Sequence, residues 1–140
     1  MNPITYTQGD ATQPKGEGPK FIVHVCNDIG GWGRGFVMAL SARWKEPEQA
    51  YRNWARSKDK FRLGEIQSIQ VEPNLWVINM IAQRDVKPSP DGIPPIREVY
   101  VGRCLAQVRE LALEKGASIH MPRIGCGLAG GKWENIQPHI

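Results

Sequence analysis

The sequence predicts an α/β protein in which helices cover both faces of a mixed β-sheet. Stretches typical of strands alternate along the chain with stretches typical of helices. Two of the predicted strands lead into glycine-rich segments that precede a helix. The composition, with 41% hydrophobic and 23% charged residues in 140, fits one folded domain spanning residues 1–140.

The first half of the chain predicts two strands and two helices. Ile4–Thr7 is predicted to form a short strand, and Phe21–Val25 is an apolar run typical of a strand buried on both faces. Large apolar residues then recur every four positions, which predicts a helix that starts near Gly33. The residues of this row are Phe36, Leu40 and Trp44. Pro47 fits the first turn of a second helix.

The second half predicts two more strands, a long loop, a helix and a further strand. Glu65–Val71 and Leu75–Ile81 are strand-like runs joined by a turn. Gln83–Ile96 contains four prolines and must be a loop. Arg97–Lys115 has helical apolar spacing and is followed by a glycine that ends it. Ala117–Met121 is predicted as the next strand.

Charge and hydropathy limit the classes of partner. The net charge of +4 favours anionic ligands, but no run of Lys or Arg forms a basic patch, so nucleic acid is an unlikely partner. No apolar run approaches the roughly 20 residues that a membrane span needs. The N-terminal residues lack signal-peptide features. We expect a cytoplasmic, monomeric protein without membrane contact.

The cysteines predict neither a disulfide framework nor a metal site. Cys26, Cys104 and Cys126 are an odd number without a close pair, which fits a reducing compartment. His24 and Cys26 resemble half of a metal site, but no partners follow at zinc spacing. We therefore expect the cysteines to be small buried hydrophobic residues, with no metal and no cofactor.

Two glycine-rich segments are the candidate ligand-binding loops. Asn27–Gly35 follows a buried strand and opens a helix, and Gly125–Gly131 repeats this arrangement before a helix expected from Trp133. Glycines allow close approach of the backbone to a ligand, and N–H groups at a helix start bind anions. Neither the Rossmann nor the Walker spacing is present. The two loops could clamp a diphosphate, and the alternative is two unrelated turns.

The residues of these loops resemble the macrodomain family. The matching segments are His24–Gly35, Pro122–Leu128, Trp133–Glu134 and Gly9–Asp10. The resemblance covers nearly the whole chain and is closest to small bacterial macrodomains, in the branch with terminal ADP-ribose protein glycohydrolase and ADP-ribose-1''-phosphate phosphatase. It implies a three-layer α/β/α fold with a mixed central sheet. The family fold usually ends with a helix and an edge strand. Because this sequence stops at Ile140, inside the last predicted helix, we expect either a truncated chain or a fold that ends there.

The resemblance also implies a set of ligand-binding residues. Asp10 would accept a hydrogen bond from the adenine amino group; its alternative role is an Asx-type turn or helix cap. Asn27 and Asp28 would lie beside the distal ribose. Trp32 would form part of the wall there, with core packing as its alternative. The full set is Gly9, Asp10, Ala11, Asn27, Gly31, Trp32, Gly33, Gly35, Ile81, Ala82, Gln83, Ile124, Gly125, Cys126, Gly127, Leu128 and Trp133.

The catalytic groups implied by the resemblance are incomplete. The attacking lysine of the glycohydrolase branch corresponds to Gln83, which cannot form a Schiff base, and its supporting aspartate corresponds to Ala129. The remaining polar residues that could take part in catalysis are His24, Asn27, Asp28 and Glu134. Of these, His24, Asn27 and Asp28 are the predicted catalytic residues. The phosphatase relatives use a histidine at the position of His24, whereas a histidine in a buried strand is usually a core residue.

Three functions follow as hypotheses. The first is an enzyme that binds ADP-ribose and hydrolyses a derivative of it, such as a protein ADP-ribosyl ester, O-acetyl-ADP-ribose or ADP-ribose-1''-phosphate. The second is a module that reads ADP-ribose without turnover. The third and weakest is a basic domain associated with RNA or DNA, which the lack of aromatic residues interleaved with Lys and Arg disfavours.

Overall fold

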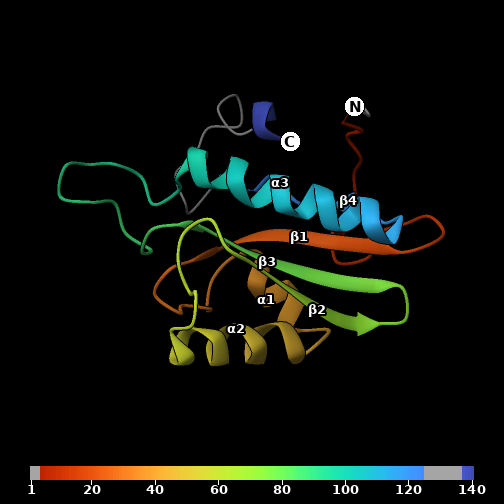
Figure 1. The fold of residues 1–140 in the computed structure, drawn as a ribbon, viewed down its shortest axis with the longest axis horizontal. Coiled ribbons are helices and arrows are strands. Elements are labelled where there is room, and N and C mark those ends of the chain that lie inside the picture. Colours follow the sequence, from red (N-terminus) through yellow and green to blue (C-terminus); the bar gives the residue numbers. More distant parts are fainter. Residues whose placement is uncertain (1–3, 125–136) are drawn as a thin grey trace.

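The structure, a computed structural model, describes residues 4–124 and 137–140. Strands and helices alternate along the described chain (Figure 1). Their bounds are β1 Lys20–Asn27, α1 Phe36–Ser41, α2 Glu46–Ser57, β2 Ile66–Glu72, β3 Leu75–Gln83, α3 Glu98–Lys115, β4 Ser118–His120 and the short 3-10 helix η2 Gln137–His139.

The described strands form a mixed four-stranded sheet in the order β2–β3–β1–β4. β1 runs parallel to both of its neighbours, β3 and β4, whereas β2 is antiparallel to β3. Since β1 has a strand on each side and helices above and below, most of its residues are buried, as its continuous apolar run predicts. The predicted α/β class with a mixed sheet is confirmed.

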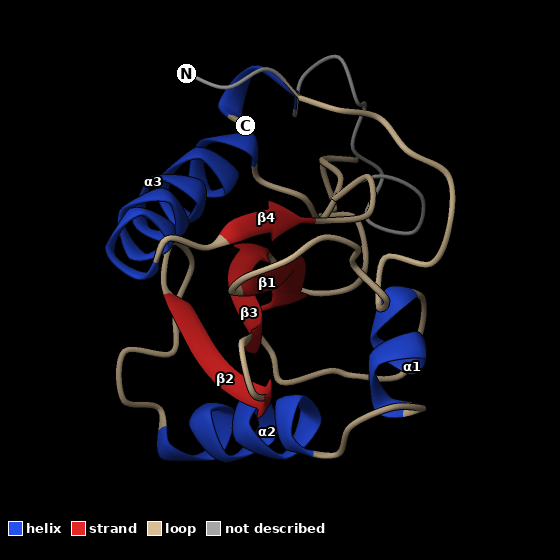
Figure 2. Cartoon of the chain, turned by 90° about the vertical axis from the view of Figure 1, so that its right-hand side faces the viewer, coloured by secondary structure: helices blue, strands red, loops and turns tan. Residues whose placement is uncertain are grey.

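Helices cover both faces of the sheet, so the molecule has three layers (Figure 2). α3 packs on one face, where Phe21 and Val23 of β1 join its cluster of buried residues. α1 and α2 cover the other face, where Ile22 and Cys26 of β1 are buried. Alternate residues of a strand point to opposite faces, so β1 contributes to both layers of the core.

The two longer helices lie where the sequence predicts them. Pro47 occupies the first turn of α2, and α3 ends at Gly116, which adopts the left-handed conformation with φ of 63°. No helix in the described part of the chain is long and apolar enough to cross a bilayer. The buried residues of α3 recur at helical spacing and are Val101, Cys104, Leu105, Val108 and Ala112.

The proline-rich segment is a loop, as predicted, and projects from the body of the molecule (Figure 1). The N–H of Arg84 donates to the carbonyl of Pro95 over 2.8 Å, and Gln83 and Ile96 form an isolated bridge beside it. The base of the loop is therefore fixed next to the end of β3.

Two predicted elements differ from the structure, and one is outside it. Ile4–Thr7 is not a strand, because strand formation needs a pairing partner and this segment joins no strand of the described sheet. The helix predicted from Gly33 through Trp44 is shorter, because the chain turns at residues 42–45 to enter α2. The helix predicted from Trp133 lies outside the described residues.

Candidate functional site

The carboxyl ends of β1 and β3 lie side by side at one edge of the sheet. Asn27 pairs with Gln83, and the N–H of Asp28 donates to the Gln83 carbonyl over 2.9 Å. β4 runs parallel to β1 on its other side, so the chain leaves β4 at the same edge. Both predicted glycine loops follow strands that end at this edge, where α/β proteins commonly bind ligands.

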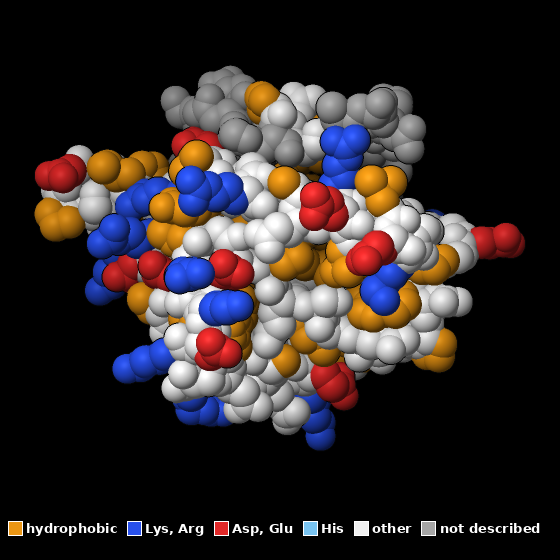
Figure 3. All heavy atoms as spheres, viewed as in Figure 1, with side chains coloured by type: hydrophobic (Ala, Val, Ile, Leu, Met, Phe, Trp, Pro, Cys, Tyr) orange, Lys and Arg blue, Asp and Glu red, His pale blue; other side chains and the backbone are white. Residues whose placement is uncertain are grey.

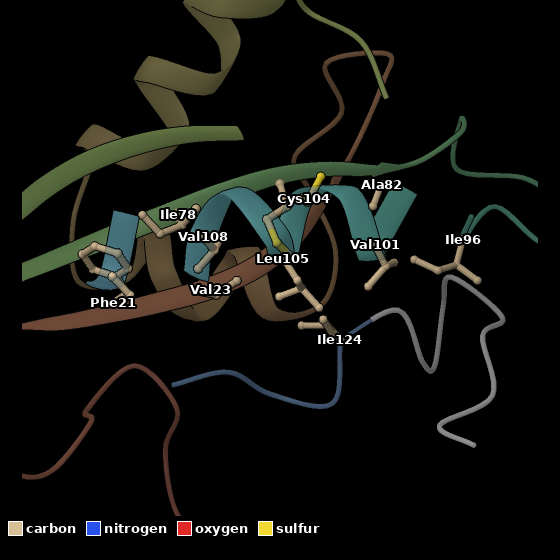
Figure 4. Packing of buried hydrophobic residues seen from close by; sticks show 12 residues of the cluster. Phe21, Val23, Ile78, Ala82, Ile96, Val101, Cys104, Leu105, Val108 and Ile124 are labelled. Atoms are coloured by element: carbon tan, nitrogen blue, oxygen red, sulfur yellow. The ribbon is translucent and has the colours of Figure 1, made fainter. Parts of the chain in front are cut away.

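The second glycine loop itself lies outside the described residues. The predicted site residues that cannot be placed for this reason are Gly125, Cys126, Gly127, Leu128, Ala129, Trp133 and Glu134. Ile124, just before them, is 2% exposed and packs below Leu105 of α3 (Figure 4). The side chain of Ile124 therefore belongs to the core, and a role of this residue in ligand binding stays a prediction.

Asn27 shapes the first glycine loop. Its Oδ1 accepts hydrogen bonds from the N–H groups of Ile29 (3.1 Å) and Gly31 (2.9 Å), and its Nδ2 donates to the Gly31 carbonyl (2.8 Å). The Tyr51 hydroxyl of α2 lies 2.6 Å from the Asn27 carbonyl and 2.8 Å from Oδ1. The Asn27 side chain is buried and committed to the conformation of the loop.

Gly31 and Gly33 are glycines for different reasons. A Cβ on Gly31 would lie 3.1 Å from Asn27 Nδ2, so internal packing requires a glycine there. A Cβ on Gly33 would meet no atom within 4 Å, and Gly33 is exposed without a positive φ. Within the described residues, the N–H groups of Gly33, Arg34 and Gly35 have no acceptor. Packing among the described residues therefore gives no reason for a glycine at position 33.

Trp32 lies in the core, with 6% of its surface exposed. The centroid of its ring is 5.5 Å from those of His24 and Tyr51, and its indole N–H donates to Ser41 Oγ over 2.8 Å. The packing alternative describes this side chain, because the ring faces the core rather than the outside of the loop. A contact between Trp32 and the distal ribose stays a prediction.

His24 is also a core residue. It is 2% exposed, and its Nε2 lies 2.5 Å from Asn79 Oδ1. Burial lowers the pKa of His24 to about 4, and the hydrogen bond with Asn79 acts in the opposite direction. His24 Nδ1 has no partner among the described residues. The histidine is therefore neutral at neutral pH and enclosed, as its core alternative predicts.

His24 begins a chain of hydrogen bonds that crosses three strands. Asn79 Nδ2 donates to Gln67 Oε1 (3.1 Å) and to the Pro47 carbonyl (3.3 Å), and Gln67 Nε2 donates to the Ala50 carbonyl (3.0 Å). Since the Asn79 amide nitrogen donates to Gln67 and Pro47, Asn79 Oδ1 is left to accept, and this assigns the His24 proton to Nε2. The sheet thereby holds α2, which in turn holds the first glycine loop.

Asp28 is the predicted catalytic residue that remains accessible. Its Oδ1 accepts a hydrogen bond from the N–H of Asp85 (2.7 Å), while Gln83 Nε2 donates to the Asp85 carbonyl (2.9 Å). The residue is only partly buried, and its Oδ2 has no partner among the described residues. Asp28 thus joins the glycine loop to the proline-rich loop and keeps one free oxygen at the strand ends.

The side chains of Ile81 and Ala82 contribute to the core. Both are fully buried, and the Ala82 carbonyl accepts the N–H of Arg97 over 2.9 Å. The N–H and carbonyl of Ile81 are bonded to Glu65 and Gly64. β3 is thus covered on both faces up to its last residues, and ligand binding at Ile81 and Ala82 stays a prediction.

Asp10 forms the Asx-type turn that was its alternative role. Its Oδ1 accepts hydrogen bonds from the Thr12 N–H (2.9 Å) and Thr12 hydroxyl (2.7 Å), and its Oδ2 lies 3.7 Å from an Arg43 nitrogen. The hydrogen bonds from Thr12, more than Arg43, lower the pKa of Asp10. Gly9 and Ala11 flank this turn. The carboxylate remains half exposed, so an adenine contact stays a prediction.

The other surface features of the described residues do not indicate a second candidate site. Two open hollows contain none of the predicted site residues; one lies between the Arg62–Glu65 segment and α3, the other along α1 and α2. On the face in Figure 3, basic and acidic side chains are interspersed. Among the described residues there is no group of three potential metal ligands. Cys26 and Cys104 are free and buried.

Several residues that support the site were not singled out by the sequence. Their shared property is a hydrogen bond to a segment more than ten positions away: Tyr51, Arg52, Gln67, Asn79, Arg43 and Asp85. No spacing or motif marks such residues, because their partners are defined only by the folded chain.

Three similar proteins each match most of this chain. Mouse chromodomain-helicase-DNA-binding protein 1-like is 31% identical over 93% of this chain, which spans only 15% of that protein. An ADP-ribose 1''-phosphate phosphatase of Lodderomyces elongisporus is 23% identical, with 96% of this chain and 88% of that protein covered. Thermosipho africanus DarTG in complex with ADP-ribose is 17% identical and shares the fold with a TM-score of 0.71, over 86% of this chain and 34% of that one.

Solved structures of similar length establish the family, although no protein-family model matches the chain. A Bacteroides thetaiotaomicron protein of unknown function is 54% identical, with a TM-score of 0.95 over 96% of this chain and 85% of that one. A macrodomain protein from Streptomyces coelicolor is 48% identical, with a TM-score of 0.83 over 94% of this chain and 84% of that one. With this identity, coverage and common fold, the chain belongs to the macrodomain family.

Proposed function

We propose that this chain binds ADP-ribose at the edge of the sheet where β1, β3 and β4 end. The observation that carries the proposal is the open backbone at Gly33, an exposed glycine that neither packing nor a positive φ requires. Two relatives support the choice of ligand, since one is an ADP-ribose 1''-phosphate phosphatase and another was solved with ADP-ribose.

The free N–H groups of the first glycine loop would hold the diphosphate. Those of Gly33, Arg34 and Gly35 have no acceptor within the described chain, and phosphate oxygens are strong acceptors. Gly125–Leu128 would approach the diphosphate from the other side. Asp10 would bind the adenine amino group through the exposed part of its carboxylate, which the hydrogen bonds of the Thr12 turn leave accessible.

Hydrolysis of an ADP-ribose derivative is a second candidate function, favoured by Asp28. Its free Oδ2 stands at the end of β1, beside the proposed position of the distal ribose. A carboxylate there can take a proton from a water that attacks an ester or a phosphate. Gln83 cannot supply the lysine chemistry of the glycohydrolase branch, and His24 is enclosed. Without turnover, the protein would be an ADP-ribose reader.

The binding proposal is tested by calorimetric titration of ADP-ribose into the wild type and the Gly33→Val variant. We expect saturable binding in the micromolar range for the wild type. The variant should keep its melting temperature, because its side chain enters open space, and should bind at least about tenfold more weakly, as a clash at the contact predicts. ADP and ribose 5-phosphate serve as partial ligands. Absence of saturable binding by the wild type would refute the proposal.

Hydrolysis is tested with ADP-ribose-1''-phosphate and with protein ADP-ribosylated on glutamate. Asp28→Asn is the suitable variant, because its Oδ1 can still accept the Asp85 N–H while the carboxylate charge is lost. Release of product by the wild type, lost in this variant without loss of ADP-ribose affinity, would support catalysis by Asp28. Binding without release from either substrate would identify a reader.

A further inference from the structure

A closed set of hydrogen bonds surrounds Trp32 on the side of the loop that faces α2. This Trp32 network consists of Trp32, Ser41, Glu48 and Arg52. The Trp32 indole N–H donates to Ser41 Oγ (2.8 Å), and the Ser41 hydroxyl donates to Glu48 Oε1 (2.9 Å). Arg52 Nε donates to Glu48 Oε2 (2.9 Å), and Arg52 Nη2 donates to the Trp32 carbonyl (3.0 Å). Both the side chain and the backbone of Trp32 are thus held by α1 and α2.

Arg52 determines the direction of the next N–H group along the loop. In a trans peptide the carbonyl and the following N–H point in opposite directions, and the described chain contains no cis peptide. Because the Trp32 carbonyl points to Arg52, the Gly33 N–H points away from α2. That is the N–H without an acceptor, on the glycine whose surroundings are open.

No other described side chain holds this part of the backbone. Asn27 fixes the loop only as far as Gly31, and Arg52 Nη1 adds a longer contact of 3.4 Å to the Gly30 carbonyl. The side chains of Arg52 and Glu48 are 40% and 34% exposed, so their removal leaves the buried core intact. Their effect on the loop can therefore be separated from an effect on the stability of the fold.

We propose that Arg52 is a positioning residue for ADP-ribose binding: held by Glu48, which also accepts a hydrogen bond from Ser41, it turns the Gly33 N–H toward the ligand without touching the ligand. The inference rests on the proposed function. A lysine cannot replace Arg52 in this role, because one ammonium group cannot hold Glu48 and the loop carbonyl with the fixed fork of a guanidinium.

The test compares ADP-ribose affinity in Arg52→Gln, Arg52→Lys and the control Arg56→Gln. Arg56 lies one turn further along α2 and bonds to Asn53 of the same helix, so its loss removes the same charge without releasing the loop. We expect both Arg52 variants to bind about tenfold more weakly, since a mobile loop must be ordered on binding, and the control to bind like the wild type. Ser41→Ala opens the network at another position and should weaken binding in the same direction.

An NMR readout separates positioning from general stability. In ¹⁵N-labelled protein without ligand, the amide of Gly33 and the indole N–H of Trp32 should shift in Arg52→Gln, while the amides of α3 should not. Wild-type affinity in Arg52→Gln, or restored affinity in Arg52→Lys, would overturn the positioning role and leave ADP-ribose binding intact. Failure of the wild type to bind ADP-ribose would overturn both proposals.

Discussion

The two faces of the sheet are built from different chemistry. The face toward α3 is packed with apolar side chains and Cys104, with Phe21 and Ile96 at opposite ends of the cluster (Figure 4). The face toward α1 and α2 contains buried polar groups as well, above all His24 and Asn79. One face therefore contributes mainly stability. The other face also fixes the place of α2 on the sheet by hydrogen bonds, and α2 in turn fixes the conformation of the first glycine loop.

This difference explains how the conformation of the first glycine loop is fixed while some of its N–H groups have no acceptor among the described residues. Apolar contacts stabilise without direction, but hydrogen bonds fix the orientation of the groups they join. Tyr51 and Arg52 occupy carbonyl and side-chain acceptors of the loop on its α2 side. The N–H groups of Gly33–Gly35, on the other side, have no acceptor among the described residues.

The largest effect is expected on the apolar face, from Phe21→Ala. Phe21 is fully buried, and its ring meets the Trp76 ring at 5.9 Å in an edge-on arrangement. Its truncation should lower the free energy of unfolding by about 4 kcal/mol, through lost burial and the cavity left behind. Urea denaturation measures this loss. The folded fraction should keep wild-type affinity for ADP-ribose, and a selective loss of affinity would contradict the division between the faces.

The next largest effect is a pH dependence of stability that comes from His24. Its pKa is lowered from 6.5 to about 4 in the folded protein, so the unfolded state binds a proton that the folded state excludes. Stability is then complete above pH 6.5 and falls as the pH drops from 6.5 toward 4, by about 3 kcal/mol in total.

Denaturant unfolding of the wild type and His24→Phe at pH 7, 5.5 and 4.5 isolates this contribution. The difference in unfolding free energy between the two proteins should shift in favour of the variant as the pH falls. His120, whose pKa burial also lowers, is present in both proteins and cancels. A difference independent of pH would mean that His24 is not held neutral by burial.

A smaller effect is expected from Asn79→Leu, which keeps the approximate size of the side chain. The substitution leaves His24 Nε2 and Gln67 Oε1 without their partner, which should cost about 2 kcal/mol in unfolding free energy. Adding His24→Phe and Gln67→Leu removes these unpaired groups and should recover part of the loss. If each substitution simply added its own cost, the hydrogen-bonded chain across the strands would not act as a unit.

The smallest effect on stability is expected from Tyr51→Phe. Only the hydroxyl is lost, with its contacts to the carbonyl and Oδ1 of Asn27, and the expected cost is about 1 kcal/mol. The loop should respond more than the fold does. Hydrogen exchange of the Gly31 amide, which donates to Asn27 Oδ1, should become faster while exchange in α3 is unchanged. Equal acceleration in both regions would indicate general destabilisation.

The apolar framework could be predicted from the sequence because its signals are local. The buried run in β1, the proline at the start of α2 and the glycine that ends α3 each act within a few residues. The roles within the loop could not be assigned in the same way. A tryptophan among glycines has the same local pattern whether it faces a ligand or the core, and Trp32 faces the core.

The polar support of the loop could not be predicted because its partners are distant in sequence. Asn79 meets Pro47 from 32 positions away, and Tyr51 meets Asn27 from 24 positions away. Asp10 shows the opposite case, in which the local alternative, a turn closed by Thr12 two positions on, is the one that forms. Hydrogen bonds of this kind compete with binding roles for the same polar residues.

The most direct test of ligand binding by the open backbone is an ADP-ribose titration of ¹⁵N-labelled protein followed by NMR. The amides of Gly33, Arg34 and Gly35 should shift to saturation at the affinity measured by calorimetry, while amides in the middle of α3 stay in place. Shifts confined to the hollow between α3 and the Arg62–Glu65 segment, or no saturable shift in the glycine loop, would contradict it.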